Sequence, residues 1–89
     1  MYFIERELNG EKKILGGAKS RNCMEWASQL GTKEKGETFT ILRATGEPVS
    51  RAIWEELAGC YRRATKKEMK ELSEKWWMKY LGQQGIDKI

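Results

Sequence analysis

The sequence has no histidine, so it lacks the side chain most often used as a general base and metal ligand near neutral pH. Its two cysteines, Cys23 and Cys60, form no CxxC pair, and two thiols without histidine cannot make a tetrahedral zinc site. Residues 16–20 contain two glycines, a lysine and a serine, but their spacing does not match the GxxxxGK[ST] phosphate loop. We therefore expect a non-enzymatic protein with no catalytic residues, no metal and no cofactor.

The sequence also lacks the cysteine pattern of a disulfide-bonded domain and any long apolar run. A secreted domain of this size usually carries about four cysteines or more, so we expect both thiols to be reduced. No stretch approaches the ~18 apolar residues of a membrane span, and no N-terminal apolar run resembles a signal peptide. We therefore expect a cytoplasmic protein that does not bind a membrane.

Aromatic bulk and positive charge are what the chain does contain. Four tryptophans, three tyrosines and two phenylalanines occur in 89 residues, which is enough chain for one domain, residues 1–89. Residues 1–49 contribute +1 to the net charge of +4, and residues 50–89 contribute +3. This uneven excess indicates an anionic partner for the second half of the chain, although a solvated surface is the alternative.

The first part of the chain has the pattern of a β-hairpin over residues 1–15. Its first strand alternates apolar and charged side chains, and the Asn-Gly that follows favours a type I′ turn. Counting outward from this turn pairs Glu7 with Lys12 and Ile4 with Leu15. An opposite-charge pair on one face and an apolar pair on the other are what a correct register gives.

A short helix over residues 21–30 follows, with Ser20 as its N-cap and Gly31 at its end. Its apolar side consists of Cys23, Met24, Ala27 and Leu30, with Trp26 at the edge. One or two strands are expected over residues 37–49, the second at an edge where Pro48 is tolerated. The predicted fold is a single α+β domain in ββαβ(β)α order, with its helices on one face of an antiparallel sheet of three or four strands.

A C-terminal helical segment is predicted over residues 51–81, with Ser50 as its cap, Gly82 as its stop and a tail over 82–89. Its apolar face, which includes two core tryptophans, consists of Ile53, Trp54, Leu57, Ala58, Tyr61, Ala64, Met69, Leu72 and Trp76. Glu68 interrupts this face, and residues 65–68 have the form of a capping box. Two helices that meet near Thr65 and one kinked helix are both compatible with the pattern.

The other side of this segment is basic and aromatic. The predicted partner-binding residues are Arg62, Arg63, Lys66, Lys67 and Lys70, with Trp77 and Tyr80 beyond them. Like charges four residues apart on a helix repel by roughly 0.2–0.5 kcal/mol per pair, which favours an anionic partner. A solvated face with screened charges is the alternative. If the helix breaks at Thr65, Arg62 and Arg63 leave this group.

The hairpin, the Gly16-Gly17 pair and the helix after it, residues 2–30, resemble the DNA-binding domain at the N-terminus of many phage-type tyrosine integrases. The resemblance implies a small sheet that binds DNA. In this chain Ala18 stands where that family has an aromatic residue, the hairpin carries three glutamates, and the third strand follows the helix, so we assign no family. The compact, tryptophan-rich build is also similar to many small phage-encoded accessory and inhibitor proteins.

Two functions fit these observations. The first is a regulatory or inhibitory protein whose basic and aromatic surface binds a protein partner with an acidic surface, for example on a nucleic-acid-handling machine. The second is direct DNA or RNA binding, in which the basic side chains contact phosphates and Trp77 or Tyr80 stacks on a base. The glutamates interleaved in the second half dilute the positive field and favour the first function. Homodimerisation is compatible with both.

Overall fold

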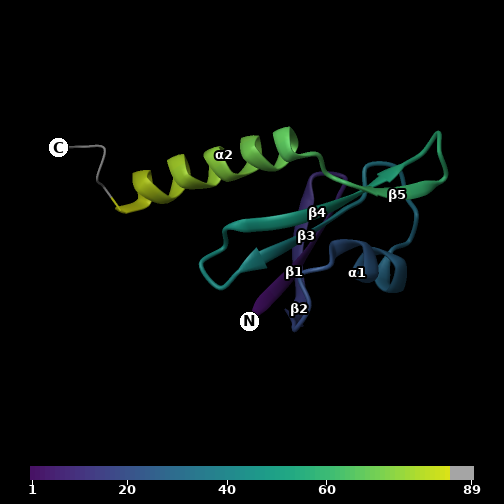
Figure 1. Cartoon of the computed structure of the whole chain (residues 1–89), viewed down its shortest axis with the longest axis horizontal. Helices are drawn as coiled ribbons and strands as arrows, with labels where there is room; N and C mark the ends of the chain where they lie inside the picture. Colours follow the sequence, from purple (N-terminus) through teal and green to yellow (C-terminus); the bar gives the residue numbers. More distant parts are fainter. Residues whose placement is uncertain (85–89) are drawn as a thin grey trace.

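The computed structural model describes the backbone of residues 1–84 and the side chains through residue 81. It contains a five-stranded antiparallel sheet and two helices (Figure 1). The elements along the chain are β1 (Tyr2–Leu8), β2 (Glu11–Ala18), α1 (Cys23–Leu30), β3 (Thr38–Arg43), β4 (Pro48–Glu55), β5 (Cys60–Arg63) and α2 (Lys66–Gln84). The order across the sheet is β2-β1-β3-β4-β5. The α+β class is confirmed, and the sheet has five strands where three or four were predicted.

The core lies between α1 and one face of the sheet. It consists of seven buried residues: Ile4, Ala18, Cys23, Ala27, Phe39, Ile41 and Ala52. The predicted inner positions of α1 are confirmed for Cys23 and Ala27, whereas Leu30 is 42% exposed. The predicted cap is displaced by two residues, because Asn22 Oδ1 accepts from Met24 N at 3.2 Å.

The β1–β2 hairpin confirms the predicted turn and part of the predicted register. Asn9 and Gly10 have φ values of 55° and 79°, as a type I′ turn requires, and Glu7 pairs with Lys12. Ile4, however, pairs with Gly16 and not with Leu15, because a bulge shifts the register after it. Gly16 has a φ of +148°, which L side chains rarely adopt, so the glycine permits this bulge.

The prediction of a helical segment over 51–81 is wrong in its first half. Residues 48–55 and 60–63 are strands, and Leu57 lies fully exposed in the turn between them. Gly59 has a φ of +68° in this turn, and its N–H donates to the Glu55 carbonyl. The predicted cap Ser50 lies inside β4, opposite Ile41 of β3.

Pairing with neighbouring strands explains why this part of the chain is extended and not helical. β4 is an inner strand that pairs with β3 on one side and β5 on the other, and the Trp54 and Tyr61 rings meet edge to face at 4.9 Å across β4 and β5. Such cross-strand contacts outweigh the helix propensity of the Glu-Glu-Leu-Ala stretch, residues 55–58, which begins at the last residue of β4. Pro48 is tolerated because it is the first residue of its strand, although this strand is not an edge strand.

The capping box is confirmed. Thr65 N donates to Glu68 Oε1 at 2.9 Å, and Glu68 N donates to Thr65 Oγ1 at 3.2 Å. A strand precedes this box, so neither two helices nor one kinked helix describes the segment. α2 passes through the predicted stop Gly82 to Gln84, and residues 85–89 of the predicted tail lie outside the described residues.

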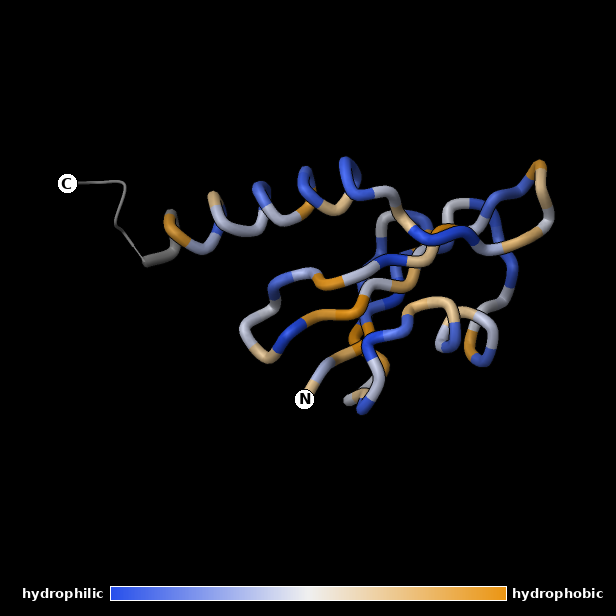
Figure 2. The backbone as a smooth tube through the Cα atoms, in the orientation of Figure 1, coloured by the Kyte–Doolittle hydropathy of each residue, from blue (hydrophilic) through white to orange (hydrophobic). Residues whose placement is uncertain are grey.

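The two helices lie on opposite faces of the sheet, not on one face as predicted (Figure 1). Strand residues alternate between faces, and α2 meets the residues that point away from α1: Thr40, Leu42, Arg51 and Ile53. α2 then extends along the β3–β4 hairpin to its turn, where an added Cβ on Gly46 would lie 3.2 Å from Trp76 Nε1. Figure 2 shows hydrophobic residues along β3 and hydrophilic residues at the first turns of α2.

Gly31 gives a direct test of how α1 packs on β5. A Cβ at this position would overlap the Tyr61 hydroxyl and the Ala27 carbonyl oxygen. We expect Gly31→Ala to lower the free energy of unfolding by about 2 kcal/mol or more in urea denaturation, as overpacking does. The matched control is Gly17→Ala, whose Cβ would meet its nearest atom at an ordinary 3.6 Å. Equal stability of both variants would contradict this packing.

Candidate functional site

Glu37 is the most deeply buried charged residue and lies just before β3. Its side chain is 0% exposed and accepts hydrogen bonds from Arg6 Nε at 2.7 Å, from Thr32 Oγ1 at 2.9 Å and from the Tyr61 hydroxyl. The backbone N–H groups of Thr32 and Lys33 also donate to it, each at 3.1 Å. These donors fill the lone pairs of the carboxylate, so Glu37 ties the loop after α1 to β1 and β5 and has no capacity left for a ligand.

The pKa values of Glu37 and Tyr61 follow from the same contacts. Burial raises the pKa of Glu37, but the hydrogen bonds from Tyr61, Arg6 and Thr32 outweigh it and lower the pKa from 4.5 to about 2. Burial and the hydrogen bond to Glu37 raise the pKa of Tyr61 to about 12. A carboxylate that stays ionised and a phenol that stays protonated near neutral pH form a structural pair, not an acid–base pair.

Arg62 does not belong to a helical basic stripe, because it lies on β5. Its guanidinium pairs with Glu55 and, at 2.7 Å and 3.0 Å, with both carboxylate oxygens of Glu68. The hydrogen bond from Arg62 is the main reason that the pKa of Glu68 falls to about 2. The charge of Arg62 is therefore compensated within the molecule, where it attaches the start of α2 to β5.

Arg63 is separated from the other predicted residues as well. Neighbouring residues of a strand point to opposite faces, so Arg63 extends to the α1 side of the sheet. There its Nη2 donates to Asn22 Oδ1 at 3.1 Å. The prediction that Arg62 and Arg63 continue one stripe with Lys66, Lys67 and Lys70 is therefore wrong.

The three predicted lysines do share one surface with Trp77. The side of α2 that faces away from the sheet carries exposed residues, which we call the outer α2 surface: Lys66, Lys67, Lys70, Trp77, Met78 and Leu81. The ion pairs of the described residues use Arg6, Arg43 and Arg62, so none of them involves a lysine of this surface. Glu71 and Glu74 are also exposed on α2 and reduce its net positive charge.

The apolar part of this surface is concentrated in one turn. Trp77 is 45% exposed, Met78 is 76% exposed and Leu81 is 38% exposed. The sequence predicted Trp77 as a partner-binding residue on the basic side of the helix but missed Met78 and Leu81, although both fall outside the apolar side of the helical wheel. Isolated apolar residues on a surface are ordinary, whereas a group of neighbouring ones is typical of interaction sites.

Tyr80 is only partly exposed because it packs along α2. Its ring stacks on Trp76 with centroids 4.9 Å apart and an interplanar angle of 16°. Trp77 meets both rings edge-on, at 4.9 Å from Trp76 and 5.8 Å from Tyr80. Tyr80 thus supports the exposed Trp77. Trp76 and Trp54 were both assigned to the core, but each is partly buried and outside the core cluster.

Within residues 1–84, no helix is long and apolar enough to cross a membrane. The described side chains also bring together no group of three or more cysteine, aspartate or glutamate residues that would hold a metal ion.

Comparisons with known proteins give neither a family nor a relative for this chain. No protein-family model, no curated protein and no solved structure matches the chain. The function must therefore be argued from the side chains themselves.

The depressed pKa of Glu37 predicts how stability varies with pH. Because its pKa is about 2 when folded and 4.5 ordinarily, its stabilising effect is complete above 4.5 and is lost as the pH falls toward 2. We expect Glu37→Gln to lower the free energy of unfolding by roughly 1–3 kcal/mol at pH 7, measured in urea. The difference from the unchanged chain should shrink at pH 3.5.

Glu71→Gln is the matched control, because Glu71 is exposed on α2. Its effect on the free energy of unfolding should stay within about 0.5 kcal/mol at both pH values. A constant difference between Glu37→Gln and the unchanged chain from pH 7 to pH 3.5 would show that the carboxylate is not held ionised.

Proposed function

We propose that this chain is a small non-enzymatic binding protein, regulatory or inhibitory in role, that engages a protein partner through the outer α2 surface. The observation that carries this proposal is the exposed turn formed by Trp77, Met78 and Leu81, on the same side of α2 as Lys66, Lys67 and Lys70. Tryptophan is enriched among the residues that dominate binding energy at protein interfaces. Leu81 lies four residues after Trp77 and three after Met78, the spacings with which side chains of a helix enter an apolar groove on a partner.

The lysines of the outer α2 surface indicate that the rim of the partner's groove is acidic. Lys66, Lys67 and Lys70 lie N-terminal to the apolar turn and have no ion-pair partner among the described side chains. Lysines in this position steer an acidic surface toward the apolar contact and raise the rate of association. An acidic groove on a nucleic-acid-handling machine has the required chemistry.

Direct DNA or RNA binding is the second candidate for this surface. The lysines and Trp77 favour it, because phosphate contacts and base stacking need these side chains. Met78 and Leu81 favour the protein partner, since neither side chain offers a flat ring for a base. Glu71 and Glu74 on the same helix repel a phosphate backbone and favour the protein partner too.

The cysteines are compatible with the cytoplasmic location that we propose. Cys23 is buried and Cys60 is exposed, and the two are not joined. An exposed free thiol persists more readily in a reducing compartment.

Trp77→Ala tests the proposed interface. The tagged full chain is used to capture partners from a lysate of its source organism, with and without nuclease. We expect a protein that stays bound after nuclease treatment, with binding weakened by about 2 kcal/mol in Trp77→Ala, roughly thirtyfold in Kd. The variant should remain folded, since Trp77 is outside the core cluster.

Leu57→Ser is the matched control, because Leu57 is fully exposed but isolated in the β4–β5 turn. Its capture of the partner should equal that of the unchanged chain. Capture that is equal in Trp77→Ala and Leu57→Ser would exclude the outer α2 surface. Loss of all capture on nuclease treatment would favour the nucleic-acid candidate.

A further inference from the structure

A basic cleft lies between the inner side of α2 and the sheet face that α2 covers only in part. Its volume is about 310 Å³. The floor comes from Thr40 and Leu42 of β3 and from Arg51 of β4. Gly46 of the β3–β4 turn and Pro48, the first residue of β4, close one end. One wall is formed by Glu5 of β1 and Lys12 of β2, and the other is formed by α2 through Leu72, Lys75, Trp76 and Lys79.

The lining of this cleft carries more positive than negative charge. Lys12, Arg51, Lys75 and Lys79 line it with one carboxylate, Glu5. Glu7 stands opposite Lys12 in the hairpin, and Glu71 lies near Lys75 in the adjoining hollow, so the excess is concentrated on Arg51 and Lys79. None of these four cations takes part in an ion pair within the described residues. Lys75 and Lys79 are also four residues apart on one helix, where like charges repel. An anion bound in the cleft would relieve this repulsion.

Arg51 is held in a fixed position at the floor. Its Nε donates to Thr40 Oγ1 at 2.7 Å, and Thr40 is only 2% exposed. The two Nη groups make no hydrogen bond to any described residue, so both remain free to donate. A planar guanidinium with two free Nη groups matches the oxygens of a phosphate, and its fixed position lowers the entropic cost of binding.

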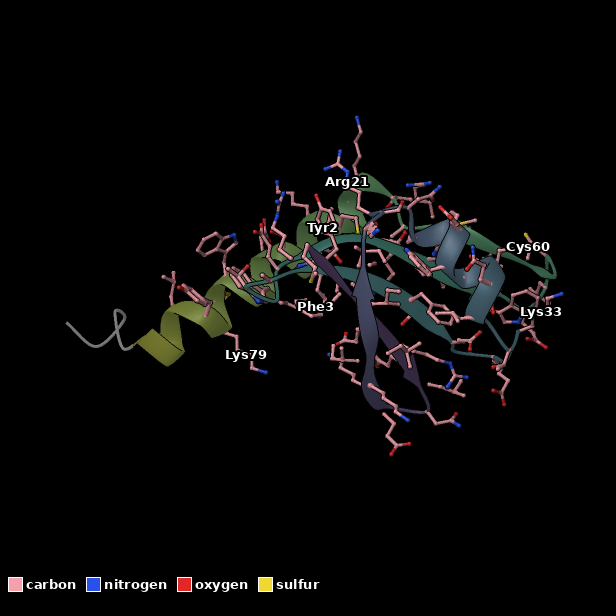
Figure 3. All side chains as sticks on the ribbon, turned by 90° about the horizontal axis from the view of Figure 1, so that it is seen from below. Tyr2, Phe3, Arg21, Lys33, Cys60 and Lys79 are labelled. Carbon is pink, nitrogen blue, oxygen red and sulfur yellow. The ribbon has the colours of Figure 1, made fainter. Side chains whose placement is uncertain are left out.

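The same cleft also has an apolar side. Leu42, Pro48, Leu72 and Trp76 form it, and the stack of Trp76 on Tyr80 keeps the indole ring in place. Figure 3 shows Lys79 extending from α2 toward the side on which the β1–β2 hairpin lies. Phosphate-binding groups and an apolar aromatic wall are thus a few side chains apart, an arrangement that suits a charged group attached to a flat ring.

We propose that this cleft binds a nucleotide unit, with its phosphate on Arg51, Lys75 and Lys79 and its base against Trp76 and Leu42. The nucleotide is either a free mononucleotide or part of a single strand, because the base must be unpaired to reach this wall. The site is separate from the outer α2 surface, which faces the opposite side of the helix. It therefore adds a second ligand to the proposed protein partner.

Binding titrations with the full chain test this site. The ligands are adenosine monophosphate, inorganic phosphate, a fluorescent single-stranded oligothymidine and a DNA duplex of equal length, at low salt. We expect the mononucleotide or the single strand to bind, and Lys75→Ala combined with Lys79→Ala to weaken this binding at least about tenfold. Lys66→Ala combined with Lys67→Ala removes the same charge from the outer α2 surface and should change binding less than about threefold. Met78→Ser should leave nucleotide binding unchanged, because Met78 is 76% exposed on the outer α2 surface, and this separates the cleft from the protein interface.

The relative affinities identify the source of the nucleotide. Equal affinity for the mononucleotide and the oligothymidine indicates a free nucleotide, and tighter binding of the oligothymidine indicates a strand; both support the site. Binding of inorganic phosphate alone, preference for the duplex, equal losses in the two double variants, or no binding by any ligand would overturn it. Circular dichroism of each variant confirms that the fold is retained.

Discussion

Glu37 carries a negative charge at 0% exposure, at the point where β1, β5 and the loop after α1 meet. A buried carboxylate is strongly unfavourable unless donors surround it, and here donors from Arg6, Thr32, Lys33 and Tyr61 do so. These donors come from three parts of the fold, so the carboxylate can be satisfied only when the hairpin, the loop and β5 are all in place. This requirement fixes α1 on its face of the sheet, and the remaining structure is arranged around that contact.

The opposite face of the sheet is organised much more loosely. α2 is attached through the Arg62–Glu68 ion pair and a few apolar contacts that end with Trp76 at the β3–β4 turn. The Thr65–Glu68 capping box is local and defines its first turn. A helix held along one narrow strip leaves its other sides exposed. That geometry gives α2 an outer side with Trp77 and the unpaired lysines, and an inner side that overhangs the basic cleft. Both proposed sites follow from this partial attachment.

The sequence predicted the elements whose signals are local. The Asn-Gly turn, the Glu7–Lys12 pair and the Thr65–Glu68 capping box each depend on residues within a few positions, and each is confirmed. The start of β4 was predicted as a short strand, but its continuation beyond residue 49 and all of β5 were missed. The Glu-Glu-Leu-Ala connection favours helix locally, and only pairing between strands overrides it. The bulge at Leu15 was also missed, since the pairing of Ile4 with Gly16 is decided across the sheet.

The same distinction applies to the functional surfaces. Trp77 was predicted on the basic side of the helix because its position on α2 follows from helical periodicity alone. Arg62 and Arg63 were placed wrongly on the helix of the three lysines, because local sequence does not show that residues 60–63 form a strand. The cleft was missed altogether, since it joins Lys12, Arg51 and Lys75, which only the folded sheet brings together.

A photo-crosslinking residue in place of Met78 tests the central claim, that the outer α2 surface contacts a protein, most directly. Met78 is 76% exposed and outside the core, so the substitution should leave the fold intact. On irradiation in cells, this variant should form a covalent adduct with one protein, and the same residue in place of Leu57 should not. Adducts of equal yield at both positions, or an adduct with nucleic acid at position 78, would contradict the account.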